Sequence, residues 1–279
     1  MSAVYHEAGA CPGHGAPGGP EPYTRAVLAV RWVGSALFVV AAMLFVVLSN
    51  VRVAALEPRV YSYSFSTYDA PAATGIDRAQ LDFAARDIVR YFRDDRELLT
   101  TRVVVDGEEQ ALFTPKEALH MRDVKSLFGR VFRLHELAFV YVVAYVGAVF
   151  VWARERPLTQ LARLCVWAGA LTVGVLAVAA GATLVGFDAL FRQFHVLSFA
   201  NDFWELDPTR DHLVQMFPRD FWFDVTLGVG IAAMLEGALL MLLGVSLRLW
   251  LQRGARDRRR VGARPDALPG EIDVGLEST

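Results

Sequence analysis

Four long runs of apolar residues dominate the sequence, and polar stretches separate them. A helix needs about 20 apolar residues to cross the roughly 30 Å hydrocarbon core of a bilayer. Each run approaches or exceeds that length, so we predict four transmembrane helices, over residues 25–51, 134–153, 164–187 and 225–247. The third run also contains glycines that predict close packing between helices, namely Gly169, Gly174, Gly181 and Gly186.

Arginine side chains gather beside two of the runs and indicate the orientation in the membrane. Arg154, Arg156 and Arg163 lie in the short loop 154–163, and the basic tail 248–279 is rich in arginine. Positive charge in short segments beside the spans marks the cytoplasmic side. We therefore predict a multi-pass plasma-membrane protein with both termini in the cytoplasm and residues 52–133 and 188–224 outside. The Gly- and Pro-rich segment 1–24 is predicted to be a disordered cytoplasmic tail.

The first outer segment, 52–133, combines helical and strand patterns. Aromatic residues and serines alternate over residues 61–68, which is typical of a strand. Asp77 is predicted to cap a helix, with Gln80 in the capping-box position. Residues 102–113 predict a hairpin that turns at Asp106 and Gly107. We therefore predict an all-α membrane protein with four transmembrane helices, a small α+β extracytoplasmic insertion between helices 1 and 2, and a short helical, aromatic-rich loop between helices 3 and 4.

A further helix is predicted to start at Thr114, because Pro115 and Glu117 follow in the positions typical of a helix start. His120 falls in its second turn, on the apolar side, and Asp123 lies about one turn further on. A nearby carboxylate can hold an imidazole in one tautomer and raise its basicity. His120 is therefore a candidate general base, although a half-buried structural histidine would give the same pattern.

The second outer segment, 188–224, is unusually rich in aromatic residues. In the stretch 194–204, polar side chains alternate with rings, and His195 lies among them. Such a loop at a membrane surface suits a substrate with a lipid tail and a polar reacting head, although an interfacial aromatic belt would look similar. Asp207 and Pro208 predict the start of a second short helix, which carries His212.

Composition and charge narrow the functional classes. Hydrophobic residues make up 54% of the chain and charged residues 21%, and the formal net charge is −2. This balance gives no indication of a nucleic-acid partner. Cys11 and Cys165 are the only cysteines, so the sequence predicts no disulfide framework. A metal site in the N-terminal tail, using Cys11, His6 and His14, is not expected because such a chain holds no coordination geometry.

Two motifs resemble those of a bacterial family of four-span integral membrane proteins that includes the lipoprotein intramolecular transacylase. The first motif, 112–125, reads LFTPKEALHMRDVK, and it resembles the family signature E-x-x-HM-x-DVK. The second comprises FH at 194–195, FANDFW at 199–204 and FPRDF at 217–221. The resemblance covers most of residues 27–250, including Tyr91 at the end of the capped helix.

The resemblance implies an acyltransferase that acts on diacylated lipoproteins and membrane lipid without a cofactor or metal. The reaction moves the sn-2 acyl chain of a diacylglyceryl cysteine to the α-amine of that cysteine and gives a lyso-form lipoprotein. It also implies catalytic roles for His120 and His195. We assign His120 as base, Asp123 as its orienter and His195 as acid or oxyanion partner, with exchangeable histidine roles. The expected substrate-binding residues are Asn201, Trp204, Asp202 and Tyr91.

Two other functions fit some of the same residues. A metal-dependent membrane hydrolase would use His120, Asp123, His195 and His212 as ligands. A non-enzymatic membrane scaffold or transporter-like protein would account for Glu236, an ionisable residue in the middle of the fourth span. The sequence specifies no oligomeric state.

Overall fold

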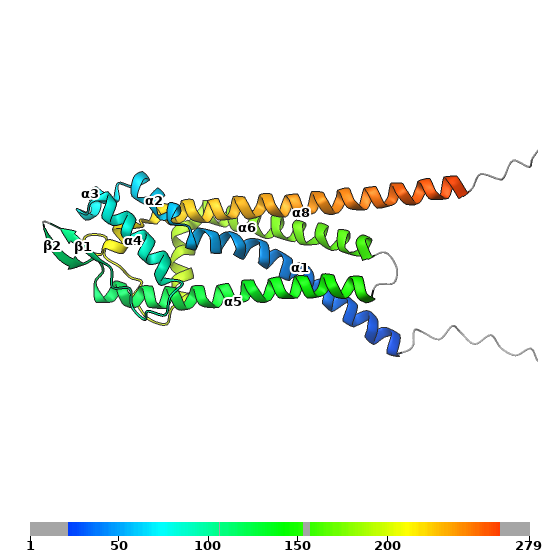
Figure 1. Cartoon of the computed structure of the whole chain (residues 1–279), viewed down its shortest axis with the longest axis horizontal. Coiled ribbons are helices and arrows are strands. Elements are labelled where there is room, and N and C mark those ends of the chain that lie inside the picture. The colour runs from blue at the N-terminus through cyan, green and yellow to red at the C-terminus, as the bar shows by residue number, and fades with distance from the viewer. Residues whose placement is uncertain (1–21, 106, 153–156, 263–279) are drawn as a thin grey trace, which may run out of the picture. The chain divides into compact units, whose positions relative to one another are not determined.

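The computed structural model describes residues 22–105, 107–152 and 157–262 and confirms the predicted fold class (Figure 1). The elements in order are α1 (Pro22–Leu56), α2 (Pro58–Thr67), α3 (Ala70–Thr74), α4 (Arg78–Tyr91), β1 (Arg102–Val105), β2 (Glu108–Ala111), α5 (Pro115–Trp152), α6 (Pro157–Ser198), α7 (His212–Met216) and α8 (Arg219–Gly262). The chain divides after Leu37 into two compact units. The second unit, which starts at Phe38, contains the core and the site described below. The predicted tail 1–24 and its candidate metal residues fall largely or wholly outside the described residues.

The four long helices α1, α5, α6 and α8 are apolar enough to cross a membrane, and the protein is a multi-pass membrane protein. Helix α5 has 38 residues, and at about 1.5 Å per residue it is far longer than a bilayer core. Its first part, 115–133, is rich in charged residues, and its apolar run begins near Leu134. The first five turns of α5 therefore lie outside the apolar run, and His120 is among them.

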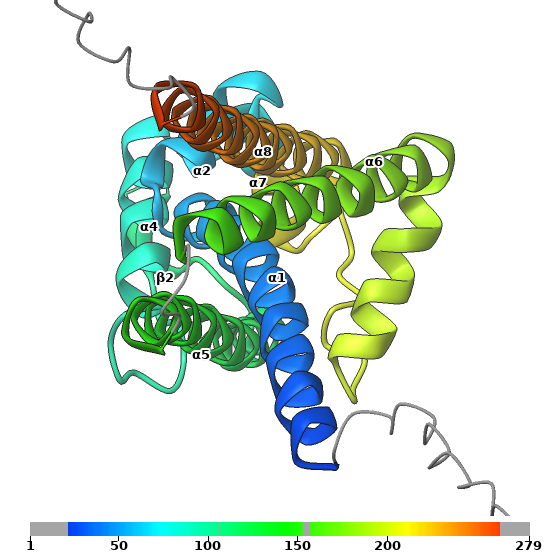
Figure 2. The ribbon, with the colours of Figure 1, turned by 90° about the vertical axis from the view of Figure 1, so that its right-hand side faces the viewer.

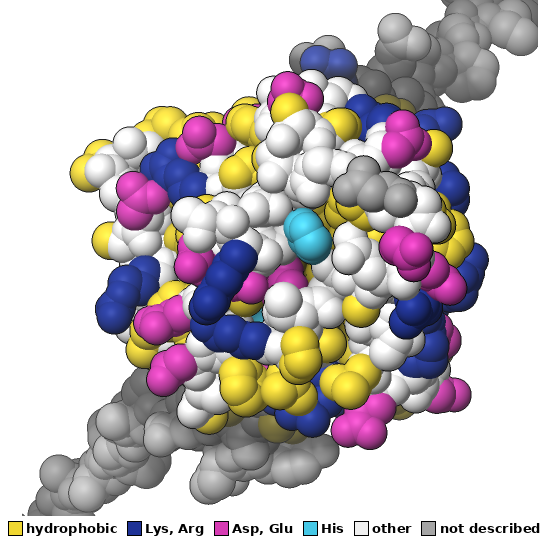
Figure 3. Space-filling view, turned by 90° about the vertical axis from the view of Figure 1, so that its left-hand side faces the viewer, with side chains coloured by type: hydrophobic (Ala, Val, Ile, Leu, Met, Phe, Trp, Pro, Cys, Tyr) yellow, Lys and Arg dark blue, Asp and Glu magenta, His cyan; other side chains and the backbone are white. Residues whose placement is uncertain are grey.

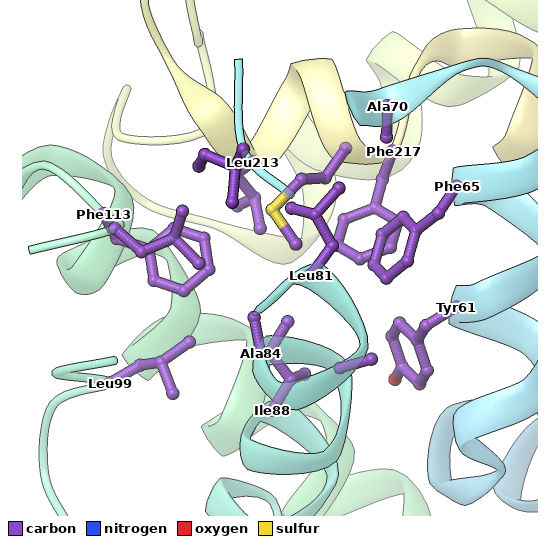
Figure 4. Packing of buried hydrophobic residues seen from close by; sticks show 14 of the residues in the cluster. Tyr61, Phe65, Ala70, Leu81, Ala84, Ile88, Leu99, Phe113, Leu213 and Phe217 are labelled. Carbon is purple, nitrogen blue, oxygen red and sulfur yellow. The ribbon is translucent and has the colours of Figure 1, made fainter. Parts of the chain in front are cut away.

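Helices α2, α3, α4 and α7 pack with the β1–β2 hairpin into a small core beyond the apolar runs. Figure 4 shows Tyr61 and Phe65 of α2 facing Leu81 and Ile88 of α4, with Phe217 beside them. Side chains of both charge signs are distributed over the surface at this end of the molecule (Figure 3). This distribution is typical of a water-exposed domain.

The strand predicted over residues 61–68 is wrong, because residues 61–67 belong to helix α2 and Tyr68 caps its end. Pro58 occupies the first turn, and the side chain of Glu57 accepts a hydrogen bond from the backbone N–H of Arg59 at 3.2 Å. The buried residues Tyr61, Ser64 and Phe65 are spaced three and four apart, which is the period of one helix face. In so short a segment, the alternation of rings and serines fits both the two-residue period of a strand and the 3.6-residue period of a helix.

Other local predictions are confirmed with smaller differences. Asp77 caps α4 by accepting from the backbone N–H of Ala79 at 2.9 Å. The capping box is not completed, because the side chain of Gln80 instead bonds the backbone of Val104 in β1. The predicted hairpin forms, with Val105 opposite Glu108; Asp106 of the predicted turn lies outside the described residues. Helix α7 begins only at His212, since residues from Asp207 form turns.

Helices α6 and α8 are in close contact, and Gly169 lies at the point of contact. A Cβ atom there would overlap the carbonyl oxygen of Gly237 and lie 2.7 Å from the backbone nitrogen of Met241. Gly174 and Gly181 have open space around them, so the predicted close packing applies only to part of the glycine series. Gly186 interrupts the helix (φ −157°, ψ 53°), and the last part of α6 turns to a new direction there (Figure 2).

Candidate active site

The start of α5 fixes the position of His120. Glu117 accepts from the backbone N–H of Thr114 at 2.7 Å, and its own N–H bonds the Thr114 hydroxyl at 3.3 Å, so the predicted capping box forms. The second carboxylate oxygen of Glu117 accepts from the backbone N–H of Leu213 in α7 at 2.5 Å. Glu117 is fully buried. It therefore connects α5 to α7 one turn before His120.

The turn in α6 fixes the position of His195. Beyond Gly186, Asp188 receives a hydrogen bond from the guanidinium of Arg219 at 2.6 Å. The same guanidinium lies over the rings of Phe187 and Phe223. Because Arg219 opens α8, this cluster attaches the turned segment 187–198 to α8 and sets the direction in which His195 points.

The structure brings His120 and His195 together. Their ring centroids are 6.1 Å apart with an interplanar angle of 30°. Each residue is only 8% exposed. Aromatic rings surround the pair: Phe199 lies 5.3 Å from His120, and Trp204 lies 5.1 Å from His195. Two imidazoles at this separation, largely shielded from water, can act on two atoms of one small reacting group.

A backbone carbonyl selects the tautomer of His195. The Nδ1 atom lies 2.7 Å from the carbonyl oxygen of Phe191, one turn earlier in α6. Because a carbonyl only accepts, Nδ1 carries the proton and donates it. A neutral His195 then has its free lone pair on Nε2. The ring of Phe191, with its centroid 4.4 Å away, restricts the imidazole further.

Burial keeps the two histidines neutral. It lowers the pKa of His120 to about 4, and the neighbouring His195 acts in the same direction while Asp123 opposes it. Burial also lowers the pKa of His195, against the effect of its bond to the Phe191 carbonyl. The predicted rise in the basicity of His120 is therefore wrong, because loss of hydration outweighs the attraction of Asp123.

Asp123 contacts the aromatic loop. Its carboxylate accepts from the side-chain amide of Asn201 at 2.8 Å, and the amide oxygen of Asn201 accepts from the backbone N–H of Phe203 at 3.1 Å. Within the described part of the chain, no hydrogen bond joins Asp123 to His120. The orienting role expected for Asp123 therefore stays a prediction, and its observed contact holds the loop next to Trp204.

The other two predicted substrate-binding residues, Tyr91 and Asp202, make no ring contact with His120 or His195 among the described residues. Tyr91 is fully buried, and its hydroxyl donates to the carbonyl of Glu97 at 2.8 Å. Burial raises the pKa of Tyr91 to about 12, with Asp94 adding to the effect. The backbone carbonyl of Asp202 accepts from the N–H of Glu205 in a turn at 3.1 Å. Binding roles for Tyr91 and Asp202 remain untested predictions.

The four residues proposed as metal ligands in the hydrolase alternative do not meet around one point among the described residues. The Nδ1 of His212 bonds the carbonyl oxygen of Leu112 at 2.6 Å and so ties α7 to the start of the first motif. Among residues 22–105, 107–152 and 157–262, no three His, Cys, Asp or Glu side chains are placed to hold a metal ion.

Two functional contacts were not predicted from the sequence. The link from Glu117 to Leu213 depends on residues 96 positions apart, and no local pattern encodes such a distance. The Phe191 carbonyl bond to His195 is a contact between residues four apart in one helix. The helical pattern before His195 could have indicated it, because position i−4 of a helix presents its carbonyl to residue i.

Comparisons with known proteins place the chain in a family. The family model described as lipoprotein intramolecular transacylase Lit matches residues 36–222. The structure of the membrane integral lipoprotein intramolecular transacylase Lit from Bacillus cereus matches with a TM-score of 0.63 and 16% identity, over 82% of this chain and 98% of that one. The structure of a variant of that protein with one histidine mutated to arginine matches with a TM-score of 0.64 and 15% identity, over 83% of this chain and 99% of that one.

A relative is also found among curated proteins. An uncharacterized protein from Aquifex aeolicus (strain VF5) is 28% identical over 133 residues, which are 48% of this chain and 56% of that protein. The match thus spans little more than half of the relative's length. The four membrane helices and the family match define the class as an integral membrane acyltransferase family. The chain belongs to the family of the lipoprotein intramolecular transacylase Lit, which confirms the resemblance seen in the two motifs.

Proposed function

We propose that this chain transfers the sn-2 acyl chain of a diacylglyceryl-modified N-terminal cysteine to the α-amine of the same cysteine, giving a lyso-form lipoprotein. Diacylated lipoproteins in the membrane are the proposed substrates. The observation that carries the proposal is the pair of buried imidazoles, 6.1 Å apart, in an aromatic setting beyond the apolar runs. The attacking amine and its ester belong to one molecule, so holding them together supplies about 7–11 kcal/mol of the barrier.

The tautomer of His195 supports a reversal of the histidine roles assigned from the sequence. With Nδ1–H bonded to the Phe191 carbonyl, the Nε2 lone pair takes the proton from the α-amine as nitrogen attacks the ester carbon. The Phe191 carbonyl also stabilises the resulting imidazolium. When the C–O bond of the ester breaks, His195 returns the proton to the departing glycerol oxygen, and the products are an amide and an alcohol.

His120 is the proposed partner of the developing oxyanion. Its lowered pKa, about 4, keeps the ring neutral, so one nitrogen carries a hydrogen that can be donated. Within the described residues, no hydrogen bond to a protein group affects the His120 ring. Donation to the carbonyl oxygen, which becomes negative during attack, stabilises the transition state more than the ground state.

The turned segment of α6 provides an apolar surface for the acyl chains. Phe194 and Leu197 are 50% and 78% exposed, and they lie on either side of His195 in the same short helical stretch. Exposed apolar groups beside a buried reacting pair suit a substrate that stays in the lipid while its headgroup reaches the histidines. By the distribution of arginine, we propose that this site faces the outside of the cell and that both termini are cytoplasmic.

Expression in a host that lacks N-acylation of lipoproteins tests the function. We expect mass spectra of lipoprotein N-termini to show one acyl chain on the amine and one on the glyceryl group. Only diacylglyceryl cysteine with a free amine would contradict the proposed activity. Presence of the protein in the membrane fraction is the control for expression.

A further inference from the structure

A groove of about 340 Å³ lies between α2 and the start of α8. Its lining residues are Arg59, Val60, Tyr63, Asp224 and Val225. On a helix, residues two positions apart point in nearly opposite directions. The ring of Trp222 is directed toward Phe191 and the histidine side, with centroids 6.4 Å apart, whereas Asp224 is directed toward α2. The groove is therefore separate from the paired histidines.

One side of the groove carries a carboxylate without a cationic partner. The Oδ2 atom of Asp224 accepts from the hydroxyls of Tyr63 and Tyr68, both at 2.6 Å. These hydrogen bonds favour the ionised form. Within the described part of the chain, no Lys, Arg or His forms an ion pair with Asp224. Two phenols thus fix a negative charge at the groove and leave its neutralisation to a ligand.

The other side of the groove carries a guanidinium that is open to a ligand. The side chain of Arg59 is 94% exposed, and its nearest carboxylate, Glu57, is 4.0 Å away. Val60 and Val225 also line the groove, and the apolar run of α8 begins at Val225. The groove therefore combines a positive group, a negative group and apolar side chains at the level where membrane lipid headgroups meet the hydrocarbon.

We propose that this groove binds the headgroup of an aminophospholipid of the phosphatidylethanolamine class. The phosphate lies on Arg59, and the ammonium donates hydrogen bonds to Asp224. Ile231 and Leu235 follow Asp224 at seven and eleven positions, so they share its helix face, and they are 57% and 67% exposed. The acyl chains extend along this face. Binding here does not depend on the proposed transacylation, because the histidines take no part.

Native mass spectrometry of the full chain, incubated in detergent with equal amounts of phosphatidylethanolamine, phosphatidylcholine and phosphatidylglycerol, tests the site. We expect the ethanolamine lipid to be bound preferentially, because the choline headgroup has no N–H donor and the glycerol headgroup no cation. Asp224→Asn should reduce the preference roughly fivefold to tenfold, because Asp224 contacts the ammonium. Arg59→Gln should reduce the bound amount of all three lipids by a similar factor, because all three carry the phosphate.

Arg102→Gln, which removes an exposed guanidinium of the hairpin that is paired with Glu109, serves as the matched control and should leave both the preference and the bound amount unchanged. Arg59 is almost fully exposed, so its substitution does not threaten folding and keeps the test valid if Asp224→Asn is unstable. Equal binding of the three lipids by the wild-type protein would overturn the proposal. So would a wild-type amount of bound ethanolamine lipid in Arg59→Gln.

Discussion

The side-chain amide of Asn201 donates a hydrogen bond to the carboxylate of Asp123 over 2.8 Å, and this bond joins the aromatic loop to α5. Trp204, three residues further along the loop, lies against His195, while Asp123 lies one turn after His120. The bond therefore joins the loop that packs against His195 to the helix that carries His120. A contact of this kind explains why an acidic residue follows His120 without bonding it.

Exchange of the two side chains tests this connection. Asn201→Asp places two carboxylates within hydrogen-bonding distance, and we expect the transacylation rate to fall about tenfold or more because like charges repel at that range. The double variant Asp123→Asn with Asn201→Asp reverses donor and acceptor and should recover most of the rate. Rates are measured as lyso-lipoprotein formed in proteoliposomes. A double variant as slow as Asn201→Asp would show that the charge of Asp123, not the bond, is required.

The proposed histidine roles predict different responses to substitution. His195→Ala and His195→Gln should both lower kcat by about 10²–10⁴-fold, since an amide cannot accept and return the proton. His120→Ala should cost about 10²–10³-fold. His120→Gln keeps an N–H donor and should retain more activity than His120→Ala. The measurement is single-turnover acyl transfer at saturating substrate.

The melting temperature in detergent, measured for each variant, controls for folding. A His195→Gln variant that recovers activity while His120→Gln does not would restore the assignment made from the sequence, with His120 as the base.

Burial of the histidines predicts the acid limb of the pH profile. The substrate α-amine, with a pKa of about 8, must be neutral to attack, so log(kcat/KM) should fall with a slope of one below that pH. The pKa of His120 is lowered to about 4 and that of His195 is also lowered. Protonation of neither histidine should therefore steepen the slope of log(kcat/KM) near pH 6.5. A second downward bend of the profile at or above the ordinary histidine pKa of about 6.5 would contradict burial of the pair.

The sequence predicted the parts of the fold that depend on local chemistry. The four spans follow from the length of the apolar runs, and the start of α5 follows from Thr114, Pro115 and Glu117. The hairpin follows from the Asp-Gly pair in the sequence, and β1 and β2 pair antiparallel on either side of it. Each of these signals is contained within a few residues or one continuous run. The aromatic and serine alternation of α2 misled because ten residues are too few to separate two periods.

The sequence alone could not give the geometry of the candidate site. His120 and His195 were selected through their motifs, but their separation depends on the turn at Gly186 and on the Arg219–Asp188 bond. Tyr91 belongs to the same resemblance, yet its hydroxyl bonds Glu97 inside the small domain. Residues that share a family pattern can therefore serve catalysis or packing, and only their contacts separate the two.

We expect the substitution Glu117→Gln to lower the free energy of unfolding strongly, although it changes only one non-hydrogen atom. Glu117→Gln replaces one accepting oxygen with an NH₂ group, which would face a buried backbone N–H of Thr114 or Leu213. We expect a loss of about 2–4 kcal/mol in the free energy of unfolding. Glu109→Gln, in an exposed pair on the hairpin, is the control and should change it by less than about 0.5 kcal/mol. Equal melting temperatures for the two variants would contradict the connection between α5 and α7.

Two glycines of α6 predict opposite effects of the same substitution. Gly169→Ala adds a methyl group where the backbone of α8 leaves no room, so the helices must separate, at a cost of about 1–3 kcal/mol. Gly174→Ala, five residues later in the same helix, meets nothing within 4 Å and should be neutral or stabilising by up to about 1 kcal/mol, since alanine favours helix. Thermal unfolding in detergent compares them directly. A Gly169→Ala protein as stable as Gly174→Ala would show that α6 and α8 are not in contact at this point.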